Sequence, residues 1–298
     1  MEEVHPHPNT PPSNSPSSPQ CTYQGKFCSQ LPKFPKILAF ELFIIWYKLL
    51  NGGAFSASIK RRGLSPGIFL FRGTLKELSA FVDESGTQEA RTTFYVVTPV
   101  MHDQSDDIFD AIRRYERSLA NRGLPNIPFH ATPLMRGHDD YAGLELAERK
   151  HLLSSFSVLV QNLPIRYRSF IYKSSEFGNP NKLQALIRRD LVSFLVDQLE
   201  YFQSYDHVKI YYDSGQPAVT HALKEAFAYG LSKEAFVTRN SNFHDYRLSQ
   251  VADYLCAIEL TSSKYLLHLS TATDEKFFGT IGTFKRNWLK QARRKLLA

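Results

Sequence analysis

The sequence lacks the features that identify secreted and membrane-spanning proteins. Among its 298 residues are only three cysteines, Cys21, Cys28 and Cys256, and their spacing fits neither a disulfide framework nor a metal site. The longest apolar run, Ile37–Leu50, is interrupted by an acidic and a basic residue. It is also shorter than the roughly 20 residues that cross a bilayer. We therefore expect a soluble protein of the reducing cytoplasm, without stable membrane association.

Several common catalytic motifs are also missing. The chain contains no Walker-type phosphate loop, no nucleophile elbow and no dinucleotide fingerprint. It contains no internal repeat that would indicate a solenoid or a propeller. These absences argue against P-loop nucleotide hydrolases, α/β-hydrolases and nicotinamide-dependent enzymes, and they turn attention to isolated polar residues.

Positive charge is concentrated at the two ends of the chain. The formal net charge is +7 and the pI is about 9.2. Residues 1–74 contain eight Lys/Arg against three Asp/Glu, whereas residues 75–284 contain 22 against 26. The last 14 residues contain six basic side chains and no acidic one. Such a basic C-terminal segment is most often a solvated helix face, and it also suits contact with a phosphate backbone, which is the hypothesis that makes nucleic acid the predicted partner.

The first 74 residues differ in composition from the rest. Six prolines precede Cys21, and Ser, Asn and Thr accompany them, a composition that cannot bury enough apolar surface to offset chain entropy. Residues 31–74 are more apolar but show no sustained period. We predict a disordered, low-complexity extension over 1–74 and a folded domain over 75–298. The extension is either dispensable or an over-long reading of the gene.

Strand and helix patterns alternate from Leu75 onward, which predicts an α/β domain with a mixed sheet of about five strands flanked by helices. Asn181 is expected to cap the helix that follows it. The expected strands are Leu78–Val82, Thr92–Val97, Ile127–His130, Ile165–Tyr172 and Val208–Tyr212. The expected helices include Asp106–Leu119, Leu144–Leu159, Pro217–Tyr229, Leu248–Leu260 and Asp274–Leu297.

Three aspartates occupy positions at which a carboxylate is informative. Asp83 and Asp213 each follow an expected strand, and ligand-binding groups collect at the carboxyl ends of strands in open α/β sheets. Asp253 is the only formal charge between Arg247 and Glu259, on a helix that is apolar nearly all round. A buried carboxylate needs a partner, either a hydrogen-bond donor such as Gln250 or a metal ion.

If the three carboxylates converge, their mutual repulsion is on the order of 4 kcal/mol per pair at about 4 Å and an effective dielectric near 20. A divalent cation removes that cost. Oxygen ligands favour Mg²⁺ or Mn²⁺, and a carboxylate site for two such ions suits in-line attack on a phosphodiester. Each aspartate also has a simpler interpretation, as a turn former or as an acceptor for a backbone amide.

Two further residues are candidates for the same site. Glu84 joins it only if the turn begins there, because in a continuing strand its side chain points to the opposite face from Asp83. His130 follows a short expected strand and suits a general acid or a phosphate clamp. A histidine that is simply hydrogen-bonded within the fold is the alternative.

The ordered set of these segments resembles the domain of unknown function 3800 family, which is grouped with the ribonuclease H-like superfamily. The matching segments are Phe81-Val82-Asp83-Glu84-Ser85-Gly86, Phe129-His130-Ala131, Ile210-Tyr211-Tyr212-Asp213-Ser214-Gly215-Gln216 and Gln250-Val251-Ala252-Asp253-Tyr254-Leu255. The resemblance covers about residues 75–298. It implies a ribonuclease H-like mixed sheet, with metal-binding acids on the first strand, on a later strand and on a C-terminal helix.

The resemblance also implies a function. Superfamily enzymes use Mg²⁺ to cut or join nucleic acid strands, and Asp83, Asp213 and Asp253 match the positions of their acids one by one. The resulting hypothesis is a Mg- or Mn-dependent nuclease in which Glu84 and His130 assist the three aspartates. The alternatives are a catalytically silent nucleic-acid or protein interaction module with the same fold, and a purely structural role for the acids. DNA and RNA both fit as partner, and the oligomeric state is open.

Overall fold

A computed structural model of the chain describes residues 75–86, 93–212, 216–231, 235–238 and 247–297. The chain divides into two units, Met1–Leu70 and Phe71–Ala298, and every described residue belongs to the second. The extension predicted over 1–74 therefore lies outside the described residues. Within the described ranges, no helix combines the length and hydropathy that crossing a bilayer requires.

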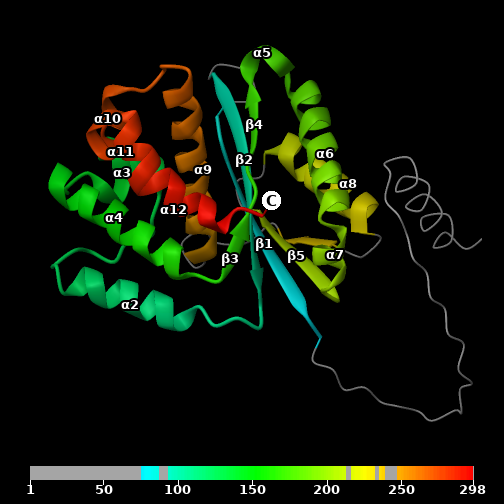
Figure 1. Ribbon diagram of the computed structural model, residues 1–298, viewed down its shortest axis with the longest axis horizontal. Helices are drawn as coiled ribbons and strands as arrows, with labels where there is room; N and C mark the ends of the chain where they lie inside the picture. Colours follow the sequence, from blue (N-terminus) through cyan, green and yellow to red (C-terminus); the bar gives the residue numbers. More distant parts are fainter. Residues whose placement is uncertain (1–74, 87–92, 213–215, 232–234, 239–246, 298) are drawn as a thin grey trace, which may run out of the picture. The chain divides into compact units, whose positions relative to one another are not determined.

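The described residues form a mixed β-sheet with helices on both faces (Figure 1). Across the sheet the order is β3-β2-β1-β5-β6, and β4 shares the edge position of β3 because both pair with β2. β1 is antiparallel to β2 and parallel to β5, and β5 is parallel to β6. The α/β class and the mixed sheet with five strand positions are thus confirmed. The strands are β1 (Glu77–Ser85), β2 (Phe94–Asp103), β3 (Ile165–Tyr167), β4 (Phe170–Lys173), β5 (His207–Tyr212) and β6 (Ala235–Thr238).

The helices form two groups, one on each face of the sheet. α9 packs against β1 and β2, with α2, α3, α4 and α10 to α12 on its far side, whereas α6 and α8 pack together on the opposite face (Figure 1). The helices are α2 (Phe109–Ala120), α3 (Ala131–Arg136), α4 (Leu146–Asn162), α5 (Ser174–Phe177), α6 (Pro180–Asp197), α7 (Leu199–Gln203), α8 (Pro217–Leu231), α9 (Arg247–Leu266), α10 (Ala272–Phe278), α11 (Ile281–Phe284) and α12 (Lys290–Ala292).

Alternation along β1 divides its side chains between two apolar cores. Leu78, Ala80 and Val82 belong to the core under α6 and α8, and Phe81 belongs to the core under α9. Each fully buried side chain of the size of Leu, Val or Phe contributes roughly 1.5–3 kcal/mol relative to exposure. The register of β1 is therefore well determined, and the next residue on the α9 face is Asp83.

Four local predictions were wrong in detail. Ile127–His130 is an extended segment outside the sheet, because side chains and not a neighbouring strand bind its backbone N–H groups. Ile165–Tyr172 contains two short strands, because the chain leaves the ladder at Arg168 and Ser169. Asn179, followed by Pro180 in the first turn, caps α6 in place of Asn181. The expected helix over 274–297 is broken after α10 and continues as short helical segments.

The break after α10 has a local cause. Gly279 follows α10 with a φ of 75°, in the left-handed region that favours glycine. Thr280 then caps α11 by accepting a hydrogen bond from the backbone N–H of Thr283 at 3.4 Å. A glycine stop followed by a threonine cap ends one helix and begins the next, which the apolar spacing alone did not reveal.

Candidate functional site

Asp83 lies near the end of β1, on the face of the sheet that α9 covers. In the pairing of β1 with β2 it is opposite Thr98, and Asp83 is partly exposed. The hydroxyl oxygen of Thr98 lies 2.8 Å from that of Ser169, which belongs to the connection between β3 and β4. The carboxylate therefore lies near the rim of the sheet, beside the strand position of Thr98.

Glu84 is directed to the other face. β1 continues to Ser85, so successive side chains point to opposite sides, and the turn begins later than the sequence indicated. The strand partner of Glu84 is Val97, which belongs to the core under α6 and α8. The condition under which Glu84 would join Asp83, a turn that begins at Glu84, is not met.

Asp253 is buried on α9, close to the helix N-terminus. Its Oδ2 accepts a hydrogen bond of 2.7 Å from the backbone N–H of Ala131, the first residue of α3. Burial raises the pKa of Asp253, while the nearby His130 and the hydrogen bond from Ala131 act in the opposite direction. Burial therefore disfavours the ionised form of this carboxylate, and a positive partner would stabilise that form.

The chain segment before α3 is held in place by side chains. The backbone N–H of Phe129 donates to Gln250 Oε1 at 3.0 Å, and that of His130 donates to the hydroxyl of Tyr141 at 3.0 Å. The Tyr141 hydroxyl itself donates to the carbonyl of Pro128 at 2.8 Å. Together with the bond from Ala131 to Asp253, these contacts take the place of a strand ladder. The segment is extended, as its residues predicted, but it lies against α9 and not in the sheet.

His130 is brought beside Asp253 by this arrangement. It precedes α3 with an extended backbone, and it is exposed although Phe129 and Ala131 on either side of it are buried. Its charge lowers the pKa of Asp253.

Cys256 lies on α9 and contacts the sheet. Its buried Sγ donates to the carbonyl of Val96 on β2 at 3.7 Å. Burial raises the pKa of this thiol most, the negative charges of Asp83, Asp253 and Glu84 raise it further, and a hydrogen bond with Thr98 lowers it. The thiol therefore lies within electrostatic reach of carboxylates from both β1 and α9.

The third predicted acid, Asp213, lies outside the described residues. The described part of β5 ends at Tyr212, which pairs with Val82, the residue before Asp83. On the α9 face of this pair of strands, the rings of Phe81 and Tyr211 stack with centroids 4.6 Å apart. The carboxyl end of β5 therefore reaches the same rim of the sheet as Asp83.

The donor chemistry of the site fits a hard divalent cation. Asp83 and Asp253 offer carboxylate oxygens, which Mg²⁺ and Mn²⁺ prefer. Among the described residues, no group of three or more His, Cys, Asp or Glu side chains has the arrangement of a metal site. A site there would need ligands in addition to the two described aspartates, such as water, substrate phosphate or a residue outside the described ranges.

Sequence reasoning missed part of the support for this site. Arg247 donates to Gln250 Oε1 at 3.0 Å, pairs with Glu116 at 3.2 Å, and lies over the ring of Tyr115 at 5.4 Å. Gln250 in turn holds the chain before His130. The spacing of Gln250 and Asp253, three residues apart on one helix side, was a usable signal for a shared backbone contact. Nothing in the sequence identified Tyr141.

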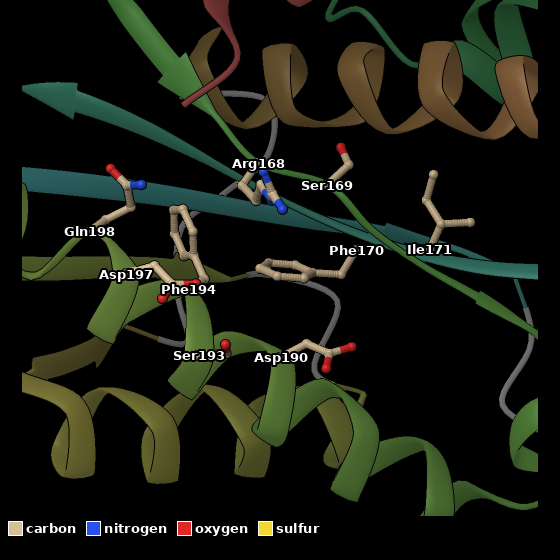
Figure 2. Close-up of a pocket in the computed structure, with 9 residues that line it drawn as sticks. All are labelled: Arg168, Ser169, Phe170, Ile171, Asp190, Ser193, Phe194, Asp197 and Gln198. Carbon is tan, nitrogen blue, oxygen red and sulfur yellow. The ribbon is translucent and has the colours of Figure 1, made fainter. Parts of the chain in front are cut away.

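A pocket of about 390 Å³ lies elsewhere, between the start of β4 and α6 (Figure 2). Arg168 lies over the ring of Phe194, with its Cζ 6.0 Å from the centroid, and the carboxylates of Asp190 and Asp197 come from α6. None of the predicted site residues lines this pocket. The candidate site is therefore separate from it, at the rim between β1 and α9.

No family model, curated protein or solved structure matches this chain. The resemblance to the domain of unknown function 3800 family consequently stays a hypothesis that depends on the motifs quoted above. The case for a function depends on the described residues themselves.

Proposed function

We propose that this chain is a Mg²⁺- or Mn²⁺-dependent phosphodiester-cleaving enzyme that acts on nucleic acid in the cytoplasm. The proposal includes the ribonuclease H-like identity of the fold, with Asp83, Asp213 and Asp253 as the metal-binding acids. Its main support is one observation: α9, on which Asp253 is buried, packs on the face of β1 where the strand alternation places Asp83.

The roles of the side chains follow from their surroundings. Asp83 is partly exposed and can bind a cation while leaving room for a phosphate oxygen. Asp253 is fixed by its hydrogen bond to Ala131, so it can hold a cation without losing side-chain freedom on binding. His130 is exposed beside it and can protonate a leaving oxygen or hold a phosphate. A bound Mg²⁺ or Mn²⁺ supplies charge neutralisation at the phosphate and lowers the pKa of an attacking water.

The described structure also supports one alternative function. Asp253 accepts a hydrogen bond from the Ala131 amide, and this contact joins α9 to α3 without any cation. A purely structural role of the buried aspartate accounts for the same contact. On this alternative the protein is a catalytically silent module that binds nucleic acid or protein. It predicts that the carboxylates can be replaced by amides without loss of any metal-dependent property.

Cleavage assays with matched variants test the proposal. The purified full chain is incubated with single-stranded, duplex and hybrid oligonucleotides in the presence of Mg²⁺ or Mn²⁺. Asp83→Asn, Asp213→Asn and Asp253→Asn are each expected to reduce cleavage at least a hundredfold, the scale on which removal of one charge-stabilising group acts. Asp197→Asn, on α6 across the sheet, is the control and should cleave as the parent does.

Two outcomes would reject the catalytic proposal. One is cleavage that is absent from the parent under all metal and substrate conditions. The other is cleavage that persists unchanged in all three aspartate variants, because this would trace the activity to a contaminant or to another site.

A further inference from the structure

A second pocket of about 370 Å³ lies between α2 and α4. From α2 and the turn after it, Arg114, Ser118 and Arg122 line the pocket at intervals of four residues, which places them on one side of the helix. The backbone of Arg122 is held in the turn by a 3.0 Å hydrogen bond to the carbonyl of Leu119. α4 supplies the other wall, with Ser154, Ser155, Val158, Leu159 and Asn162.

The side chains that line this pocket carry positive charge. Two of them are arginines and none is acidic. In the part of the chain that the structure describes, neither Arg114 nor Arg122 has a carboxylate within ion-pair distance. The two acids of α2 form their ion pairs with other arginines, Asp110 with Arg113 and Glu116 with Arg247, although the charge of Arg114 also lowers the pKa of Asp110. Residues 75–284 have a slightly negative net charge, so two arginines without an ion pair at one pocket differ from their surroundings.

The pocket also offers neutral hydrogen-bond groups and an apolar floor. Ser155 is 7 % exposed, and among the described residues its hydroxyl has no hydrogen-bond partner. A buried hydroxyl without a partner is costly, and a bound ligand or water is the usual remedy. Ala111 and Leu159 are buried, and Val158 is exposed at 57 % beside them. Together these residues provide an apolar surface next to the arginines.

We propose that this pocket binds a phosphate-bearing ligand of the nucleotide type. Arg114 and Arg122 hold its phosphate groups, and the exposed side chain of Val158 receives its base. Arg114 on α2 and Arg122 in the turn after it line the same pocket, so their two side chains can close around one phosphate or two linked ones. The pocket lies among α2 and α4 and uses none of the proposed metal-binding residues, so this inference does not depend on the proposed catalytic function.

Calorimetric titration of the full chain with ADP tests the inference. The buffer contains a chelator, so that the proposed metal site does not contribute, and NaCl keeps the ionic strength constant. The parent is expected to bind ADP at one site and to bind adenosine at least tenfold more weakly, because adenosine lacks the phosphates. Arg114→Gln and Arg122→Gln should each weaken ADP about tenfold, and the double variant should abolish measurable binding.

Arg117→Gln is the matched control, because this exposed arginine is on the same helix but outside the pocket. It should bind ADP as the parent does. The inference is overturned if the parent binds neither ADP nor inorganic phosphate, if the double variant binds ADP like the parent, or if Arg117→Gln weakens binding as much as the pocket variants do.

A competition experiment with the parent protein distinguishes a free nucleotide from a nucleic acid strand as the natural ligand. A short single-stranded oligonucleotide that displaces ADP identifies a nucleic acid strand as the natural ligand. An oligonucleotide that leaves ADP bound identifies a free nucleotide. Loss of ADP binding in the double variant with metal-dependent cleavage retained would separate this pocket from the proposed catalytic site.

Discussion

The two faces of the sheet differ in the kind of side chain they bury. The core under α6 and α8 consists of aliphatic and aromatic residues, and among the buried polar side chains of the described residues only Thr220 belongs to that side. The α9 face buries polar groups within its apolar core, among them Gln250, Asp253 and Glu259. Buried polar groups cost stability unless each has a partner. The comparison shows that one face is packed almost wholly with apolar side chains, whereas the other depends on partners for its buried polar groups, among them the proposed site residue Asp253.

The largest expected effect tests whether the polar groups of the α9 face depend on their partners. Arg293 binds the buried carboxylate of Glu259 through two hydrogen bonds, of 2.7 and 3.0 Å, and the Tyr167 hydroxyl donates to the same carboxylate at 2.7 Å. Arg293→Ala leaves the buried carboxylate without its counter-charge and should lower the free energy of unfolding by about 4 kcal/mol. Urea denaturation measures this change.

The neighbouring exposed residue provides the control for that experiment. Arg294→Ala should change the free energy of unfolding by less than about 0.5 kcal/mol. The double variant Arg293→Ala with Glu259→Gln should recover at least half of the loss, because the buried charge is then gone. A double variant as unstable as Arg293→Ala would show that packing, and not the unpaired charge, causes the effect.

The apolar face should respond to volume alone. Leu223 on α8 is fully buried, and Leu223→Ala should lower the free energy of unfolding by about 3 kcal/mol because it leaves a cavity. Leu223→Met nearly conserves the volume and should cost less than about 1.5 kcal/mol. Neither variant should alter metal binding measured below the unfolding temperature. A change in metal affinity in Leu223→Met would show that the two faces are not separate in function.

Asp253 distinguishes a hydrogen-bonding role from a role for the charge. Asp253→Ala removes the acceptor of the Ala131 amide and should cost about 2 kcal/mol in the free energy of unfolding. Asp253→Asn keeps an acceptor oxygen and removes a poorly solvated charge, so without divalent ions it should be at least as stable as the parent. Equal losses in both variants, measured by thermal and urea denaturation in a chelator, would contradict this account.

The smallest effect concerns His102, a buried histidine on β2. Burial lowers its pKa below the usual 6.5, so the unfolded chain takes up this proton at a higher pH than the folded chain does. The stability that this histidine contributes is therefore complete above about pH 6.5 and declines as the pH falls below that value. His102→Gln should show a weaker decline over that window, whereas His207→Gln, at an exposed histidine on β5, should follow the parent. Identical slopes in all three proteins would contradict the assignment.

The sequence predicted the parts of the fold that depend on period and composition. Alternation and an apolar helix surface have clear periods, so three features were predicted correctly. They are the pairing of β1 with β2, the strand before Asp213 and the buried helix around Asp253. The segment Ile127–His130 has the composition of a strand, and its residues are extended. Which partner satisfies its backbone groups depends on Gln250 and Asp253, more than a hundred residues away.

The candidate site stays a prediction, and the structure shows where its described residues lie. Asp83 and Asp253 were predicted from their positions on a strand end and a buried helix, and His130 from its place in an ordered motif. Glu84 illustrates a limit of local reasoning, because one additional residue of strand changes the face to which a side chain points. The supporting contacts of Tyr141 and Arg247 depend on tertiary packing, for which the sequence carries no periodic signal.

The most direct test of the central claim is a calorimetric titration of Mn²⁺ into the full chain, its Asp83→Asn and Asp253→Asn variants, and the control Asp197→Asn. If Asp83 and Asp253 share a cation, the parent and the control bind Mn²⁺ in a saturable manner, and each site variant loses at least tenfold in affinity. Mn²⁺ binding that is equal in all four proteins, or undetectable in the parent, would contradict the claim.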